Sequence, residues 1–138
     1  ARGPARRPGR SLGGRGLGCL GDLWRIGRAA RAFGRGARLE RRGRLAEARE
    51  ALEASRRLVA EEAGSRSLEP ARFSARLSAT ALLATVAARA GEADLARDAA
   101  REGLGLWAAA RIQAPRARDL AAMAEWADWA KRYLAGRT

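Results

Sequence analysis

The sequence contains no histidine and no asparagine, and it has one lysine (Lys131) and one cysteine (Cys19). Without histidine, neither a Ser-His or Cys-His nucleophile pair nor a histidine acid–base step is available. One cysteine excludes a disulfide within the chain, and the lack of histidine excludes a Cys/His zinc site. We therefore expect a protein that is not an enzyme and that uses no cofactor.

Residues that favour strands are also scarce, since valine and isoleucine each occur only twice and aromatic residues make up 5% of the chain. Hydrophobic residues make up 47%, and most of them are alanine and leucine, which favour helices. A chain of 138 residues is long enough for one domain with a core. No run of 18 apolar residues occurs and no apolar stretch follows the Arg pair at 6–7, so we expect a cytoplasmic protein.

The apolar pattern predicts an all-α domain over residues 19–138, preceded by a basic, flexible segment over residues 1–18. That segment is rich in Gly, Arg and Pro and has no apolar period. Five helices are predicted: one beginning near Cys19–Asp22 and ending at Gly43, then Leu45 to about Ala63, Glu69 to about Ala90, about Glu92 to Ile112, and about Arg116 to Leu134.

One signature of turn and helix occurs twice in the chain. Residues 43–48 (Gly-Arg-Leu-Ala-Glu-Ala) precede Leu52 and Ser55, and residues 91–96 (Gly-Glu-Ala-Asp-Leu-Ala) precede Ala100 and Gly103. Each copy predicts a tight glycine turn between two antiparallel helices, with small residues where the helices touch. A repeated helical hairpin is a scaffold for binding rather than a reaction centre.

Apolar spacing predicts which helix faces are buried. The expected faces are Leu23, Ile26, Ala30, Phe33 and Ala37 in the first helix; Leu45, Ala48, Leu52, Ser55 and Val59 in the second; Phe73, Leu77, Leu83 and Val86 in the third; and Ala96, Ala100, Gly103 and Trp107 in the fourth.

The last helix carries an aromatic stripe, Trp126, Trp129 and Tyr133. We expect it to cap the second hairpin as a C-terminal capping helix. The alternative is an exposed aromatic patch that binds a partner or a second copy of the chain, because Trp and Tyr are strong interface anchors. A homo-oligomer is therefore one possible assembly.

This pattern resembles the tetratricopeptide repeat, a helix–turn–helix unit of 34 residues. In the first copy, Gly36, Gly43 and Ala48 stand where the family has its helix glycine, its turn and its small alanine. The second copy matches at Gly91 and Gly103, although the two turn glycines lie 48 residues apart. An unrelated helical bundle with glycine turns is the alternative.

The resemblance implies a binding face formed by the first helix of each hairpin. It would carry Phe33, Ala37 and Arg41 beside Leu82, Thr85 and Arg89. Two arginines on such a face can hold a carboxylate of a peptide. The resemblance thus implies an adaptor that binds a partner protein.

The 28 basic residues outnumber the 15 acidic ones, and residues 1–44 hold 13 arginines against two acidic residues. Such asymmetry indicates an anionic partner, either nucleic acid or an anionic membrane surface. The alternatives are arginines that only face water and the composition of a GC-rich genome. The candidate polyanion contacts are Arg2, Arg6, Arg7, Arg10, Arg15, Arg25, Arg28, Arg31, Arg35 and Arg38.

Overall fold

The computed structural model describes residues 2–60, 68–112 and 117–137, and the side chains of residues 20–60, 68–110 and 121–137. The described residues form five α-helices and no strand, which confirms the predicted all-α class. The helices are α1 (Arg2–Arg41), α2 (Leu45–Leu58), α3 (Glu69–Arg89), α4 (Ala93–Ile112) and α5 (Ala117–Leu134). Over this part of the chain, none of the helices combines the length and the apolar character that a membrane crossing requires.

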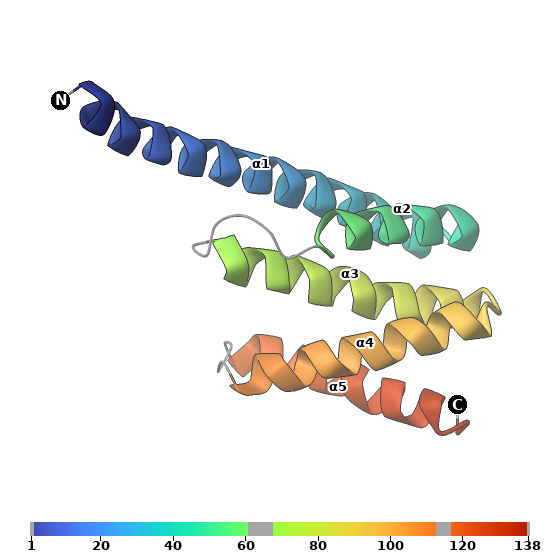
Figure 1. Cartoon of the computed structure of the whole chain (residues 1–138). Helices are drawn as coiled ribbons and strands as arrows, with labels where there is room; N and C mark the ends of the chain where they lie inside the picture. The colour runs from blue at the N-terminus through green and yellow to red at the C-terminus, as the bar shows by residue number, and fades with distance from the viewer. Residues whose placement is uncertain (1, 61–67, 113–116, 138) are drawn as a thin grey trace.

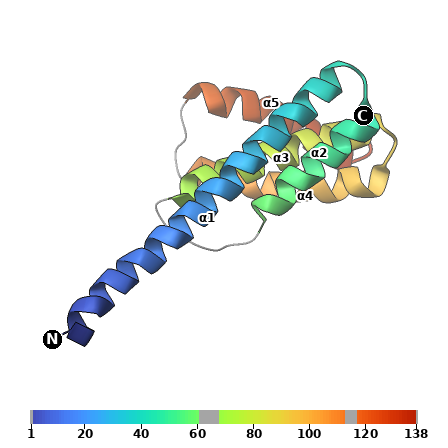
Figure 2. The same cartoon turned by 90° about the horizontal axis from the view of Figure 1, so that it is seen from above.

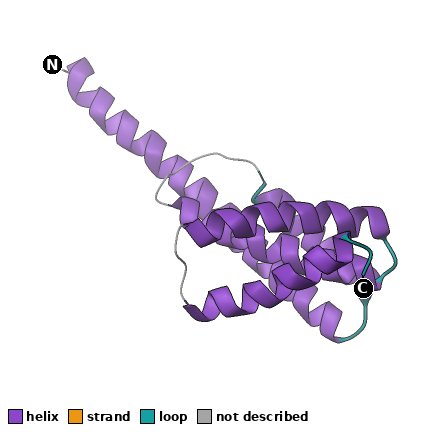
Figure 3. Ribbon diagram, turned by 90° about the horizontal axis from the view of Figure 1, so that it is seen from below, coloured by secondary structure: helices purple, strands orange, loops and turns teal. Residues whose placement is uncertain are grey.

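The helices form two antiparallel hairpins and a final helix (Figure 1). α1 and α2 make the first hairpin, α3 and α4 make the second, and α5 packs on α4. The hairpins join through contacts of α3 with both α2 and α1. Figures 2 and 3 show that the N-terminal half of α1 extends beyond the other helices.

The two predicted glycine turns are confirmed and have the same geometry. Gly43 and Gly91 have φ angles of +76° and +78°, a left-handed conformation that glycine adopts without steric cost. In both turns, the N–H of the next residue donates to the carbonyl four residues before the glycine, at 2.9 Å. This bond satisfies a carbonyl that the helix end would leave unpaired, so both hairpins turn in the same way.

The second helix of each hairpin buries residues at the same distances from its turn glycine. These residues are Ala48, Leu52 and Ser55 in α2 with Val59 directly after it, and Ala96, Ala100, Gly103 and Trp107 in α4. The two predicted faces are therefore confirmed, except that Leu45 is only half-buried.

Small residues bring α1 and α2 close together. A Cβ added to Gly36 would lie 2.7 Å from the Cγ of Leu52, closer than real Cβ contacts come. Further along, the buried Ser55 hydroxyl donates to the carbonyl of Ala29 at 2.7 Å. The first hairpin thus depends on the absence of a side chain on α1 and on one hydrogen bond between the helices.

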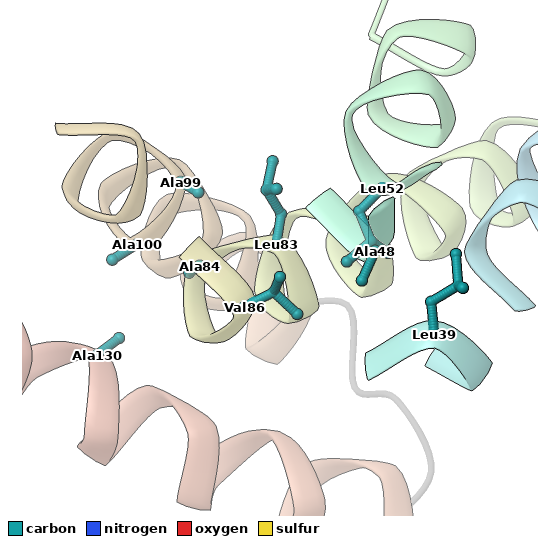
Figure 4. Close-up of a cluster of buried hydrophobic side chains, with 9 residues drawn as sticks. All are labelled: Leu39, Ala48, Leu52, Leu83, Ala84, Val86, Ala99, Ala100 and Ala130. Carbon is teal, nitrogen blue, oxygen red and sulfur yellow. The ribbon is translucent and has the colours of Figure 1, made fainter. Parts of the chain in front are cut away.

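The main core draws on all five helices (Figure 4). Its buried residues are Leu39, Ala48, Leu52, Leu83, Ala84, Val86, Ala99, Ala100 and Ala130. A second cluster of Leu77, Trp107, Ala110 and Ala127 lies between α3, α4 and α5. The expected core residues of α3 are confirmed as buried except Phe73, which is half-buried against the second cluster.

The predicted start of the first helix is wrong, because α1 begins at Arg2 rather than near Cys19–Asp22. α1 thus includes residues 2–18, where the sequence predicted a flexible segment, although Pro8 has no N–H to donate within it. Pro4 falls in the first turn, where a missing N–H loses no bond, and arginine is a good helix former. Propagation from a packed helix adds one bond per residue. The division of the chain at residue 18 stays a prediction.

The predicted buried face of α1 is also partly wrong. Leu23 is 52% exposed and Ala30 is exposed, whereas Ala29, Gly36 and Leu39 are buried. Close packing against α2 favours the stripe of small residues, and the 14-residue α2 is too short to cover Leu23.

The other predicted helix bounds agree closely with the structure. The exception is α2, which ends at Leu58 and not near Ala63. Residues 61–67, which include the expected loop at Gly64, lie outside the described residues. The predicted start of the last helix at Arg116 also lies outside them.

Candidate functional site

The α1–α3 face is the surface that carries the six residues predicted to bind a partner. Phe33 and Leu82 are half-buried and pack against the main core. Ala37 and Thr85 are half-buried beside them on the same two helices, and the Thr85 hydroxyl donates to the Leu82 carbonyl at 2.9 Å. Because α1 contacts α3, the structure brings the two halves of this set onto neighbouring helices.

The two arginines of this face, Arg41 and Arg89, are exposed but differ in their partners. Arg89 forms an ion pair with Glu40 of α1, which links the ends of α1 and α3. Arg41 forms no ion pair with any described residue. The face therefore offers one unpaired guanidinium and a second whose exposed pair can exchange its carboxylate for that of a ligand.

The aromatic residues of α5 hold this helix on the second hairpin. The Trp126 indole N–H donates to the carbonyl of Ala81 in α3 at 2.9 Å. Its ring also covers Gly103 of α4, where an added Cβ would lie 2.3 Å from the ring edge. Trp126 thus contacts both helices of the hairpin, as expected of a capping helix.

The other two aromatic residues extend from Trp126 along α5. The rings of Trp129 and Tyr133 are stacked, with centroids 5.2 Å apart, and Trp129 packs against the main core. All three rings are half-buried. An aromatic interface with a partner stays a prediction, and it would use only the exposed edges of these rings.

A polar network joins three helices at Glu102 of α4. Its carboxylate accepts a 2.5 Å hydrogen bond from Arg56 of α2 and a 3.2 Å bond from Arg76 of α3. The Thr80 hydroxyl of α3 donates to the same carboxylate at 3.3 Å. Glu102 is thus the carboxylate on which the second helix of the first hairpin and both helices of the second hairpin converge.

Burial by itself would raise the pKa of Glu102, but the hydrogen bond and charge of Arg56, together with Arg76, outweigh it. The net effect lowers the pKa of the Glu102 carboxyl. For Arg56, burial would lower the pKa of the guanidinium, and its bonds to Glu102 and Asp98 raise it overall. A carboxyl with a lower pKa in the folded state stabilises the fold above its unfolded pKa, and this contribution is lost as pH falls through the folded value.

We therefore expect acid to destabilise the wild-type protein more than a Glu102→Gln variant. The extra loss should develop as pH falls below the ordinary glutamate pKa of about 4.3. It is measured by urea unfolding at a series of pH values. Glu125→Gln, at an exposed residue with no ion pair to any described residue, is the control and should keep the wild-type pH dependence. Equal pH dependence in Glu102→Gln and wild type would contradict this role.

The outer stripe of α1 is a row of exposed side chains that recur every three or four residues. Its members are Leu20, Trp24, Arg28, Arg31, Arg35 and Arg38, together with Arg42, which directly follows the last residue of α1. No arginine of this row forms an ion pair with any residue that the structure describes. Arg25 is exposed on the same helix but lies off this row.

Five predicted polyanion contacts cannot be placed on this surface. The side chains of Arg2, Arg6, Arg7, Arg10 and Arg15 lie outside the described ones. Conversely, sequence reasoning left Arg42 out of its set, although Arg42 continues the three–four spacing of Arg35 and Arg38.

Sequence reasoning also missed the role of Glu102, because its partners come from two other helices. The signal that points to Glu102 is its position three residues after the buried Ala99, about one turn along the same side of α4. Among the described residues, no three His, Cys, Asp or Glu side chains gather in a way that could hold a metal ion.

Comparisons with protein-family models, curated proteins and solved structures find no match to this chain.

Proposed function

We propose that the chain is a non-enzymatic adaptor of the cytoplasm that binds a segment of a partner protein on the α1–α3 face. The observation that carries this proposal is the side-by-side packing of α1 and α3, the first helices of two hairpins with the same turn. In the tetratricopeptide repeat, which the sequence resembles, the corresponding helices carry the bound peptide.

Matched burial in the two hairpins supports the resemblance. Ala48 and Ala96 are fully buried one turn after their glycines, and Leu52 and Ala100 are fully buried one turn later. In a helical bundle without repeats, nothing requires the same positions after each turn to be buried. Two equivalent hairpins place equivalent positions of α1 and α3 on one side of the molecule. This arrangement favours binding of an extended segment over binding of a single side chain.

The chemistry of the face favours a segment with an acidic residue or a free carboxyl terminus. Phe33 and Leu82 supply apolar area, and Arg41 supplies a guanidinium that pairs with no described carboxylate. Guanidinium–carboxylate bonds are charge-assisted and add specificity of orientation. Arg89 would join when a ligand carboxylate replaces Glu40 in its ion pair.

Selection from a peptide library rich in Asp and Glu, with the full chain as bait, tests this proposal. The double variant Arg41→Glu with Arg89→Glu should weaken binding of the selected peptides by about tenfold or more, because two attractive charges become repulsive. Isothermal titration of one selected peptide measures the loss. Circular dichroism should show unchanged helix content, since both side chains are exposed.

Arg97→Glu with Arg101→Glu is the matched control, because both residues are exposed on α4 and the change in net charge is the same. This variant should bind the peptide nearly as well as wild type. Equal weakening in the two variants would mean that only net charge matters, and unchanged binding in the first would exclude the α1–α3 face.

A further inference from the structure

The outer stripe of α1 combines strong positive charge with exposed aromatic and apolar side chains. Trp24 is 56% exposed and Leu20 is 63% exposed, and both precede the arginines on the same line. Most side chains of the stripe point away from α2 and α3, because they lie opposite the buried Ala29 and Gly36, whereas Arg28 lies at the edge beside α2. The stripe belongs to neither the core nor the α1–α3 face.

The arginines of the stripe repel one another along α1 while nothing anionic is bound. Successive members such as Arg31 and Arg35 stand three or four residues apart, where like charges destabilise a helix by about 0.2–0.5 kcal/mol per pair. Elsewhere, Arg56 and Arg89 pair with carboxylates of other helices. The stripe has no such carboxylate among the described residues, so a bound row of anions would remove the repulsion.

A long polyanion fits the stripe better than a single anion. An α-helix rises 1.5 Å per residue, so Arg28 to Arg42 spans about 21 Å. The five arginines along this line can each contact a different phosphate of one chain. A shallow cavity of about 300 Å³ beside Arg28 is lined by Ala54, Arg57 and Leu58, and it adds Arg57 of α2 as a sixth cation.

The contact between Trp24 and Arg28 favours one class of polyanion over another. The Arg28 guanidinium carbon lies 4.8 Å from the centroid of the Trp24 ring, so the ring and the cation are held together. Unpaired bases stack on such aromatic and guanidinium groups, whereas the bases of a duplex are already stacked. The pair therefore favours a single strand over a double helix.

An anionic membrane fits the same side chains less well. A helix that lies on a membrane buries an apolar face along its length. In α1 that face packs against α2 and α3 from Ala29 to Leu39, and the exposed large apolar side chains of the described residues fall within Leu20–Trp24. One turn of apolar residues leaves most of the stripe without apolar neighbours.

We infer that the outer stripe of α1 binds single-stranded nucleic acid, with the arginines on the phosphates and Trp24 against an unpaired base. This site is separate from the α1–α3 face, so either can fail without the other. Fluorescence anisotropy of the full chain with a labelled single-stranded oligonucleotide of mixed sequence tests it. The same titration is run with the matching duplex and with vesicles of anionic phospholipid, each at two salt concentrations.

The triple variant Arg31→Glu, Arg35→Glu and Arg38→Glu should weaken single-strand binding by about tenfold or more. The slope of log affinity against log salt should become shallower by about 2, since each phosphate contact contributes about 0.7. The control Arg97→Glu, Arg101→Glu and Arg132→Glu makes the same change in net charge at exposed residues of α4 and α5. This control variant should bind the single strand with nearly the wild-type affinity.

Trp24→Ala should weaken single-strand binding by about fivefold or more, the usual effect of losing one stacked base, while duplex binding changes little. Leu23→Ala, at an exposed neighbour off the stripe, is the control and should have little effect. The inference is overturned if the two triple variants lose the same affinity for the single strand, or if Trp24→Ala binds it as tightly as wild type. It is also overturned if the protein binds the vesicles but not the oligonucleotide, or if it binds no oligonucleotide at low salt. Circular dichroism checks that every variant keeps its helices.

Discussion

Leu52→Ala is expected to destabilise the protein by about 2–5 kcal/mol, the usual range for a buried leucine truncated to alanine. Leu52 is fully buried, lies in the main core, and packs directly against the backbone of Gly36. Both hairpins contribute to this core, so the cavity would weaken their contact as well as the first hairpin. Urea unfolding followed by circular dichroism measures the loss.

Gly36 gives a sharper test of the same contact. Gly36→Ala alone should destabilise, because the new Cβ meets Leu52 and has no room. In the double variant Gly36→Ala with Leu52→Ala, the removed leucine leaves space, so the two losses should add to less than their sum. Gly34→Ala, whose Cβ would meet only the end of the Arg38 side chain, is the control and should stabilise. If the losses of stability from the two single variants simply add in the double variant, the contact between Gly36 and Leu52 is contradicted.

Gly103→Ala and Gly105→Ala are expected to shift stability in opposite directions, although both lie in α4. A Cβ at Gly103 would lie 2.3 Å from the Trp126 ring, and we expect a loss of about 1–3 kcal/mol as α5 is displaced. A Cβ at Gly105 would have nothing within 4 Å. There the better helix propensity of alanine should add up to about 1 kcal/mol.

Thermal unfolding of both variants checks the sign of each change. Near-ultraviolet circular dichroism should change in Gly103→Ala, because the Trp126 ring must move, and should stay the same in Gly105→Ala. A stabilised Gly103→Ala protein would show that α5 does not dock on this glycine.

The turns could be predicted from the sequence because glycine has a specific physical role there. Gly43 and Gly91 each end a helix in a left-handed conformation, and the small residues that follow them are buried as expected. Local chemistry at these positions decides the structure, so no knowledge of distant contacts is needed.

The buried face of α1 could not be predicted in the same way, because the helix has two stripes that could each be buried. Periodicity of large apolar residues selected Leu23 and Phe33, whereas packing selected Ala29 and Gly36. Which stripe is buried depends on how far α2 reaches along α1 and how closely it approaches. The sequence predicted that α2 reaches about Ala63, whereas it ends at Leu58.

The candidate sites show the same limit. The sequence predicted Arg31, Arg35 and Arg38 as polyanion contacts, and all three lie on one exposed side of α1. The Glu102 network could not be predicted, because its partners Arg56 and Arg76 come from two other helices. Likewise, the pairing of Arg89 with Glu40 depends on how the hairpins meet.

The binding of a partner segment on the α1–α3 face is tested most directly by nuclear magnetic resonance. The isotope-labelled full chain is titrated with the acidic peptide that the selection yields. The adaptor hypothesis predicts that the backbone amides of Ala37, Leu82 and Thr85 show the largest changes in chemical shift. Shift changes confined to α2 and α4, or to the outer stripe of α1, would contradict it.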